Sequence, residues 1–159
     1  LTMLNKTRYC NTKTMNIGGG KNYPQSLEEE KIFLAKIQHE SGLEMKRIFE
    51  LYKRYGTKVV DIANFVTKND HFPDKYLEFH KSYTYGEIAY IVVHEHVVRL
   101  EDLLLRRTML GMMGELTVQL IEELCEIVGG CLGWSDRTCR SEIDNVVNIL
   151  HDKHGVKLL

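Results

Sequence analysis

The chain has 159 residues, of which 43% are hydrophobic and 27% are charged, a composition typical of one soluble globular domain. Its 21 basic and 22 acidic side chains leave a net charge near -1, which argues against nucleic acid or an anionic membrane as a partner. No apolar run approaches the ~20 residues that span a bilayer, and the start lacks a signal-peptide core. The first residue is Leu1 rather than methionine, so we expect a processed chain or a piece of a longer protein.

Residues 1–25 are polar and glycine-rich and show no helical period, which predicts an extended lead-in. The stretch "GGGK" in this segment invites comparison with a phosphate-binding loop. A P-loop requires Ser or Thr after its lysine, whereas Lys21 is followed by Asn22. The dinucleotide-binding pattern G-x-G-x-x-G fails as well, because Tyr23 takes the place of its last glycine. We therefore interpret this glycine run as an ordinary loop.

After Pro24 the pattern becomes helical. Ser26 and Glu29 are spaced as a capping box, which predicts a helix that ends near Ser41 and Gly42. A second helix is expected over residues 43–55, followed by a glycine, and a short third one over residues 59–66. The polar stretch "TKNDHFPD" that follows is the clearest internal loop.

A second run of helices is predicted from Tyr83 onward, including one through "RLEDLLLRR", with a break at Gly111 and Gly114. Apolar residues then recur at three- and four-residue spacing from Leu116 until "GGCLGWS", the strongest amphipathic pattern in the chain. A last helix is expected between a cap at Ser135 and a glycine at position 155. The sequence thus predicts an all-α fold, with six or seven helices in a single domain over residues 26–159.

The segment "HEHVVRLEDLLLRRTMLG", residues 94–111, is the densest in functional side chains. His94 and His96 are two residues apart, so on a helix they point about 200° apart and cannot chelate one ion. Asp102 and Arg106 form an i, i+4 pair, which by itself is typical of a solvated helix face. Arg107 projects about 100° from Arg106 and is placed to reach a different carboxylate or phosphate. The pattern indicates neither a metal site nor a catalytic group.

The cysteines, Cys10, Cys125, Cys131 and Cys139, show no C-x-x-C spacing of the kind that zinc sites use. We expect four reduced thiols in a cytosolic protein.

The same segment resembles the C-terminal helical domain of FAD-dependent glycerol-3-phosphate dehydrogenases and the related glycerophosphate oxidases. The residues that carry the resemblance are, in order, His94-Glu95, Leu100-Glu101-Asp102, Arg106-Arg107-Thr108 and Gly111. "LGWS" before the last helix and "GEIAY" upstream fit the family's order of helices. The resemblance covers the chain from about Cys10 to His154 and is specific only in this central motif.

The resemblance implies a parent enzyme that oxidises glycerol 3-phosphate to dihydroxyacetone phosphate, with FAD as cofactor and a quinone or oxygen as electron acceptor. Family members hold the flavin site and the active centre in a large N-terminal domain, whose motifs this sequence lacks. This chain is then expected to be a non-catalytic cap that binds no cofactor or metal and packs on the FAD-binding domain. The residues expected to dock it there, or to brace its helices, are Glu95, Asp102, Arg106, Arg107 and Thr108, with Glu95 and Asp102 as internal partners of the arginines.

Two other classes of function stay open. One is a free-standing helical interaction or regulatory module, which could touch nucleic acid through Lys6, Arg8, Lys13 and Lys21, although the near-neutral charge counts against this. The other, an independent small-molecule enzyme, is disfavoured by the helical geometry of the only dense cluster. We expect a cytoplasmic location, with a parent that is either soluble or peripheral at the cytoplasmic face of a membrane. An apolar docking face would also allow the fragment to form a homodimer.

Overall fold

The computed structural model describes residues 12, 13 and 15–158, and these confirm the all-α fold class. Within the described residues six helices have ten residues or more, and the only β-type pairing is an isolated bridge between Tyr76 and Thr84. The chain divides into two compact units, residues 1–63 and 64–159. The expectation of one helical domain over residues 26–159 stays a prediction. No helix of the described part is long and apolar enough to cross a membrane.

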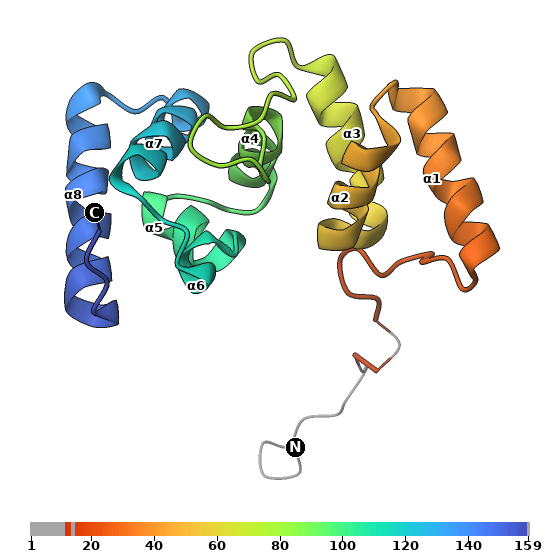
Figure 1. Ribbon diagram of the computed structural model, residues 1–159, viewed down its shortest axis with the longest axis horizontal. Coiled ribbons are helices and arrows are strands. Elements are labelled where there is room, and N and C mark those ends of the chain that lie inside the picture. The colour runs from red at the N-terminus through yellow and green to blue at the C-terminus, as the bar shows by residue number, and fades with distance from the viewer. Residues whose placement is uncertain (1–11, 14, 159) are drawn as a thin grey trace, which may run out of the picture. The chain divides into compact units, whose positions relative to one another are not determined.

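The first unit is built from α1 (Leu27–Ser41), α2 (Met45–Tyr55), the 3₁₀-helix η2 (Gly56–Lys58) and the start of α3 (Val59–Lys68) (Figure 1). Helix α1 begins as the sequence predicts, because the Ser26 hydroxyl accepts a hydrogen bond from the Glu29 amide at 3.2 Å. The Glu29 carboxylate reaches back one residue further than expected, to the amide of Gln25 at 2.7 Å. Gly42 ends the helix in the left-handed conformation.

The core of this unit comes from one apolar stripe on each helix. Helices α1 and α2 are in contact, and the fully or nearly fully buried side chains between the elements are Leu34, Ile37, Ile48, Leu51, Tyr52, Val59 and Ile62. The predicted lead-in packs on this core through Tyr23, whose ring stacks on Tyr52 with 5.3 Å between centroids.

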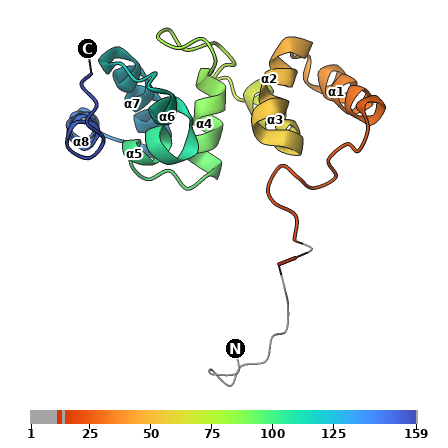
Figure 2. The same ribbon diagram turned by 60° about the horizontal axis from the view of Figure 1, so that its bottom comes forward.

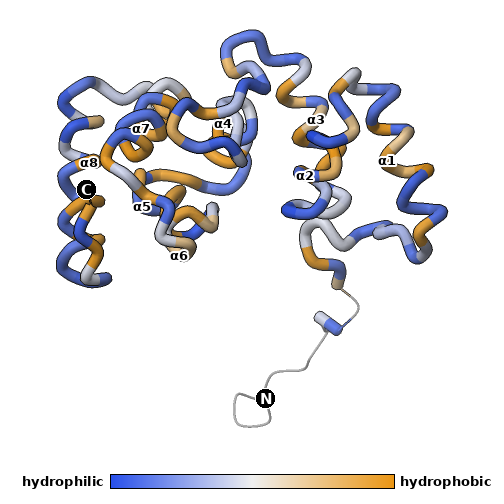
Figure 3. Tube along the Cα trace, in the orientation of Figure 1, coloured by the Kyte–Doolittle hydropathy of each residue, from blue (hydrophilic) through white to orange (hydrophobic). Residues whose placement is uncertain are grey.

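The second unit contains α4 (Tyr85–His94), α5 (Leu100–Asp102), the π-helix η3 (Leu103–Arg107), α6 (Leu110–Met113), α7 (Val118–Leu132) and α8 (Asp136–His154). Helix α7 lies between α4 and α8 and contacts both (Figure 1). Its apolar positions Leu120, Ile121, Leu124 and Val128 are fully buried. Hydrophobic and hydrophilic residues alternate along α8, as expected of a helix with one inward face (Figure 3).

Two predicted boundaries differ from the observed ones in this unit. Helix α7 continues through Gly129 and Gly130 to Leu132, because buried contacts on one side outweigh the poor helix propensity of two glycines. The expected helix through "RLEDLLLRR" is instead a single α-turn, α5, followed by the π-helix η3. The caps at Ser135 and Gly155 are as predicted.

Candidate docking surface

Residues 94–111 begin where α4 ends. The ring of His94 stacks on Tyr90 with 4.2 Å between centroids, and its Nδ1 lies 3.0 Å from the Tyr90 carbonyl, so Nδ1–H donates to that oxygen. His96 lies beyond the helix, in the left-handed region at φ 54°. The structure therefore does not bring the rings of His94 and His96 together. In the part of the chain that the structure describes, no three His, Cys, Asp or Glu side chains are grouped to hold a metal ion.

Asp102 ties the start of α5 to its end. One carboxylate oxygen accepts the amides of Arg99 at 3.0 Å and Val98 at 3.2 Å, and the other lies 2.5 Å from Nη1 of Arg106. Burial by itself raises the pKa of Asp102, but the two backbone amides and the Arg106 guanidinium outweigh burial, so that the pKa lies below its ordinary value. The carboxylate is therefore ionised at neutral pH and acts as a helix cap and ion-pair partner.

The two arginines have different partners. Arg106 pairs with Asp102, as the i, i+4 spacing predicts, and lies 3.8 Å from Glu101, while its side chain stays 63% exposed. Arg107 donates from Nε to the main-chain carbonyl of Glu95 at 2.7 Å, which links the end of η3 to the end of α4. Because that acceptor is uncharged, the bond leaves the positive charge of Arg107 at the surface.

Thr108 and Gly111 explain the rest of the motif. The amide and the hydroxyl of Thr108 both donate to the carbonyl of Leu103 at 3.0 Å, which closes the π-turn. Gly111 lets α6 pack closely against this turn, since a Cβ at this position would lie 2.8 Å from Leu105 Cδ2 and 2.9 Å from the Leu104 carbonyl oxygen. Thr108 and Gly111 thus hold η3 and α6 together, while Arg107 links η3 to the end of α4.

The sequence did not single out the buried carboxylates of this unit, Glu87, Glu123 and Glu142, and the bonds of the last two are described here. Glu142 of α8 accepts from Arg99 Nη1 at 2.7 Å and from the buried amide of Leu100 at 3.0 Å. Glu123 of α7 accepts the amides of Glu78 and Phe79 at 2.7 and 3.1 Å, and the hydroxyl of Tyr85 at 2.7 Å. Their positions in the sequence could have revealed them, because each acid lies within the inward apolar stripe of its helix. A carboxyl group buried there requires hydrogen-bond or ion-pair partners.

In the first unit the "GGGK" run has a structural role. Thr57 donates from its amide and hydroxyl to the carbonyl of Gly19, at 2.9 and 3.1 Å, and from its hydroxyl to the carbonyl of Lys21 at 2.8 Å. Gly19 and Gly56 approach so closely that a Cβ on Gly56 would lie 2.3 Å from the Gly19 carbonyl oxygen. The glycine run is therefore bound to η2 through its main-chain carbonyl groups.

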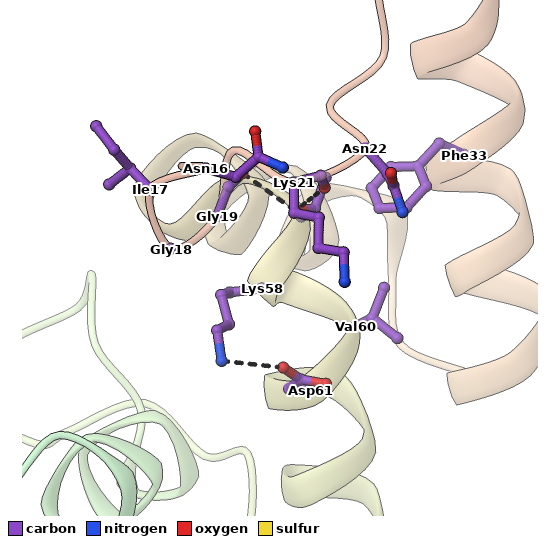
Figure 4. A pocket seen from close by; sticks show the side chains of 11 residues that line it. Asn16, Ile17, Gly18, Gly19, Lys21, Asn22, Phe33, Lys58, Val60 and Asp61 are labelled. Atoms are coloured by element: carbon purple, nitrogen blue, oxygen red, sulfur yellow. Dashed lines mark hydrogen bonds and ion pairs between the residues drawn. The ribbon is translucent and has the colours of Figure 1, made fainter. Parts of the chain in front are cut away.

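Beside this turn lies a hollow of about 510 Å³ (Figure 4). Lys21 and Lys58 both line it, and Lys58 pairs with Asp61 at 3.4 Å. The other lining residues are Asn16, Ile17, Gly18, Gly19, Asn22, Phe33, Thr57 and Val60. The candidates Lys6 and Arg8 for a basic patch lie outside the described residues, as does Cys10.

The described cysteines, Cys125, Cys131 and Cys139, have free thiols. Burial raises the pKa of Cys125 to about 12, with a further contribution from Cys139, and burial raises the pKa of Cys131 to about 11. Both groups are therefore protonated at neutral pH.

Taken together, these observations define an all-helical domain whose motif residues Asp102, Arg107 and Thr108 make hydrogen bonds at helix ends and turns. The family model for the C-terminal domain of alpha-glycerophosphate oxidase matches residues 10–139, and the chain belongs to this family. A "probable glycerol-3-phosphate dehydrogenase" of Encephalitozoon cuniculi (strain GB-M1) is 28% identical over 151 residues. That match covers 94% of this chain but only 23% of the relative, so the chain spans less than a quarter of the relative's length. No solved structure matches the chain significantly.

Proposed function

We propose that this chain is the accessory helical domain of an FAD-dependent enzyme that oxidises glycerol 3-phosphate to dihydroxyacetone phosphate, passing electrons to a quinone or to oxygen. The observation that carries the proposal is the family match over residues 10–139 of a chain that spans only 23% of its dehydrogenase relative. FAD and the substrate would be bound by the N-terminal domain of the same polypeptide, which is the partner of this one.

A non-catalytic role is supported by the bonds of the candidate side chains. Asp102, Arg106 and Thr108 are engaged in helix caps and turns, and Glu123 and Glu142 accept buried amides. The glycine run also lacks the G-x-G-x-x-G pattern of a dinucleotide-binding turn, and its Gly19 packs against Gly56 and Thr57. The chemistry of the family would then be supplied outside this domain.

We further propose that Glu95, Asp102, Arg106, Arg107 and Thr108 brace a surface that docks on the flavin domain. Arg106 is 63% exposed, and Arg107 is exposed and donates to an uncharged carbonyl, which supports the docking part of this role. The alternative, a free-standing interaction module, has no comparable support. Binding of this chain to a phosphate-rich resin that weakens steeply with added salt would point to it instead.

The test compares this chain with the longer polypeptide that contains it, and measures flavin content and glycerol 3-phosphate oxidation in both. We expect bound flavin and turnover in the long form alone. Turnover by the 159-residue chain, or a gene that encodes only these residues, would contradict the proposal.

A further inference from the structure

Helix α6 and its N-cap residue place three methionines on one exposed surface. Met109, Met112 and Met113 are 52%, 77% and 62% exposed, and their i, i+3, i+4 spacing puts them on the same side of one helical turn. Figure 2 brings α6 to the front of the second unit. Methionine is a flexible hydrophobic residue that is enriched in protein interfaces, so this surface, called here the α6 methionine surface, requires an explanation.

The surface is held in position by the bonds of the family motif. Thr108 closes the turn that precedes α6, Gly111 allows α6 to pack against that turn, and Arg107 ties the turn to α4. These bonds and contacts are internal to the unit, whereas the methionines point away from it. A motif that fixes three exposed methionines in place is better explained by recognition than by stability alone, because exposed apolar side chains add little to folding.

The charges beside the surface indicate the chemistry of the partner. Arg106 and Arg107 directly precede it, and both are exposed. The methionines form an apolar centre and the arginines a positively charged rim. A complementary partner surface would have apolar side chains at its centre and carboxylates around them. Three methionines supply only part of the ~800 Å² per partner of a standard interface, so the arginines would belong to the contact area.

We propose that the α6 methionine surface is the apolar centre of the interface with the flavin domain. The inference rests on the proposed function, since that domain would account for the large part of the relative that this chain does not span. Elsewhere Leu27 and Ile32 of α1 are 78% and 64% exposed, but they are five residues apart and point to different sides of their helix. They provide a matched control.

The experiment is hydroxyl-radical footprinting of the 159-residue chain and of the long polypeptide, read by mass spectrometry of peptides. We expect labelling of Met112 and Met113 to fall several-fold in the long form, while labelling of Leu27 and Ile32 stays the same. Equal labelling of the methionines in both forms would overturn the proposal, as would protection of Leu27 and Ile32 in their place. Protection within the 159-residue chain that rises with its concentration would also overturn it, because the occupant would then be a second copy.

A double substitution provides the second measurement. Met112→Glu with Met113→Glu changes only exposed side chains, so the melting temperature of the 159-residue chain should not change. In the long form the same change should lower the melting temperature and speed proteolytic release of this domain, whereas Leu27→Glu with Ile32→Glu should not. An unaffected long form would reject the interface, while its flavin content and turnover would still decide the proposed function.

Discussion

Glu142 places its carboxyl group inside the second unit, with 5% of the residue exposed. We expect Glu142→Ala to lower the free energy of unfolding by about 2–3 kcal/mol, because the buried Leu100 amide and the Arg99 guanidinium lose their acceptor. Glu142→Gln keeps an acceptor oxygen and should cost about 1 kcal/mol. Urea unfolding followed by circular dichroism measures both differences.

Asp144 provides the control for this experiment, since it is exposed on the same helix. Asp144→Ala should change the free energy of unfolding by no more than ~0.5 kcal/mol. If Glu142→Ala behaved like this control, the carboxylate would contribute nothing to the attachment of α8.

Asp102 predicts a dependence of stability on pH. Its pKa in the folded protein lies below the ordinary value of about 3.9, so the folded state binds its proton less readily than the unfolded chain. The stabilisation is therefore complete above the unfolded pKa and is lost as the pH falls through the folded pKa. We expect the difference in unfolding free energy between wild type and Asp102→Asn to shrink on acidification, measured by urea titrations at several pH values. A difference that does not change with pH would refute this role.

For the helices, replacing one of two glycines with alanine should have opposite effects on stability, depending on how closely the helix packs there. Gly111→Ala places a methyl group 2.9 Å from the Leu104 carbonyl oxygen, so we expect a loss of about 1–3 kcal/mol as α6 is forced from the π-turn. Gly130→Ala in α7 meets nothing closer than 3.9 Å and should gain up to ~1 kcal/mol from helix propensity. Thermal unfolding measures the change in stability of each variant relative to wild type. If both variants changed stability in the same direction, the close packing of α6 would not determine the effect of Gly111→Ala.

The helix ends were predictable where they depend on local chemistry. Ser26 and Ser135 cap by hydrogen bonds within three residues, and Gly42 and Gly155 adopt left-handed conformations that their lack of a side chain permits. The π-turn was not predictable. The spacing of apolar residues indicates an α-helix with i, i+4 hydrogen bonds, whereas the Thr108 amide bonds to the Leu103 carbonyl five residues earlier. This longer turn depends on the packing of α6.

In the candidate site, too, contacts between neighbours in the sequence were predictable, whereas contacts between distant residues were not. The pair of Asp102 and Arg106 is local to one helical stretch and follows from its spacing. The bonds of Arg99 and Leu100 to Glu142 join residues more than forty positions apart, so they follow from tertiary packing. The sequence showed an acid in an apolar stripe, which indicates that a partner exists but does not identify it.

Replacing Arg106 and Arg107 in both the 159-residue chain and the long polypeptide separates an effect on docking from an effect on folding. The exposed ion pair of Arg106 contributes about 0–1 kcal/mol and the hydrogen bond of Arg107 to the Glu95 carbonyl about 0.5–1.5 kcal/mol, so replacing both with alanine should lower the free energy of unfolding of the 159-residue chain by no more than about 2 kcal/mol. A loss in the long polypeptide beyond this amount is then due to docking. In the long polypeptide the same change removes the charged rim of the proposed interface. We expect a lower melting temperature and lower turnover there, with a larger effect at low salt than at high salt.

Arg137 and Arg140 of α8 are the matched control, since both are exposed and their replacement with alanine removes the same charge from another helix. This control variant should leave the turnover and the melting temperature of the long form unchanged. Equal losses in the two double variants would trace the effect to net charge rather than to position. If the Arg106 and Arg107 variant of the long form kept full stability and activity, the docking role would be refuted, and only the internal bracing by Asp102 and Thr108 would account for the motif.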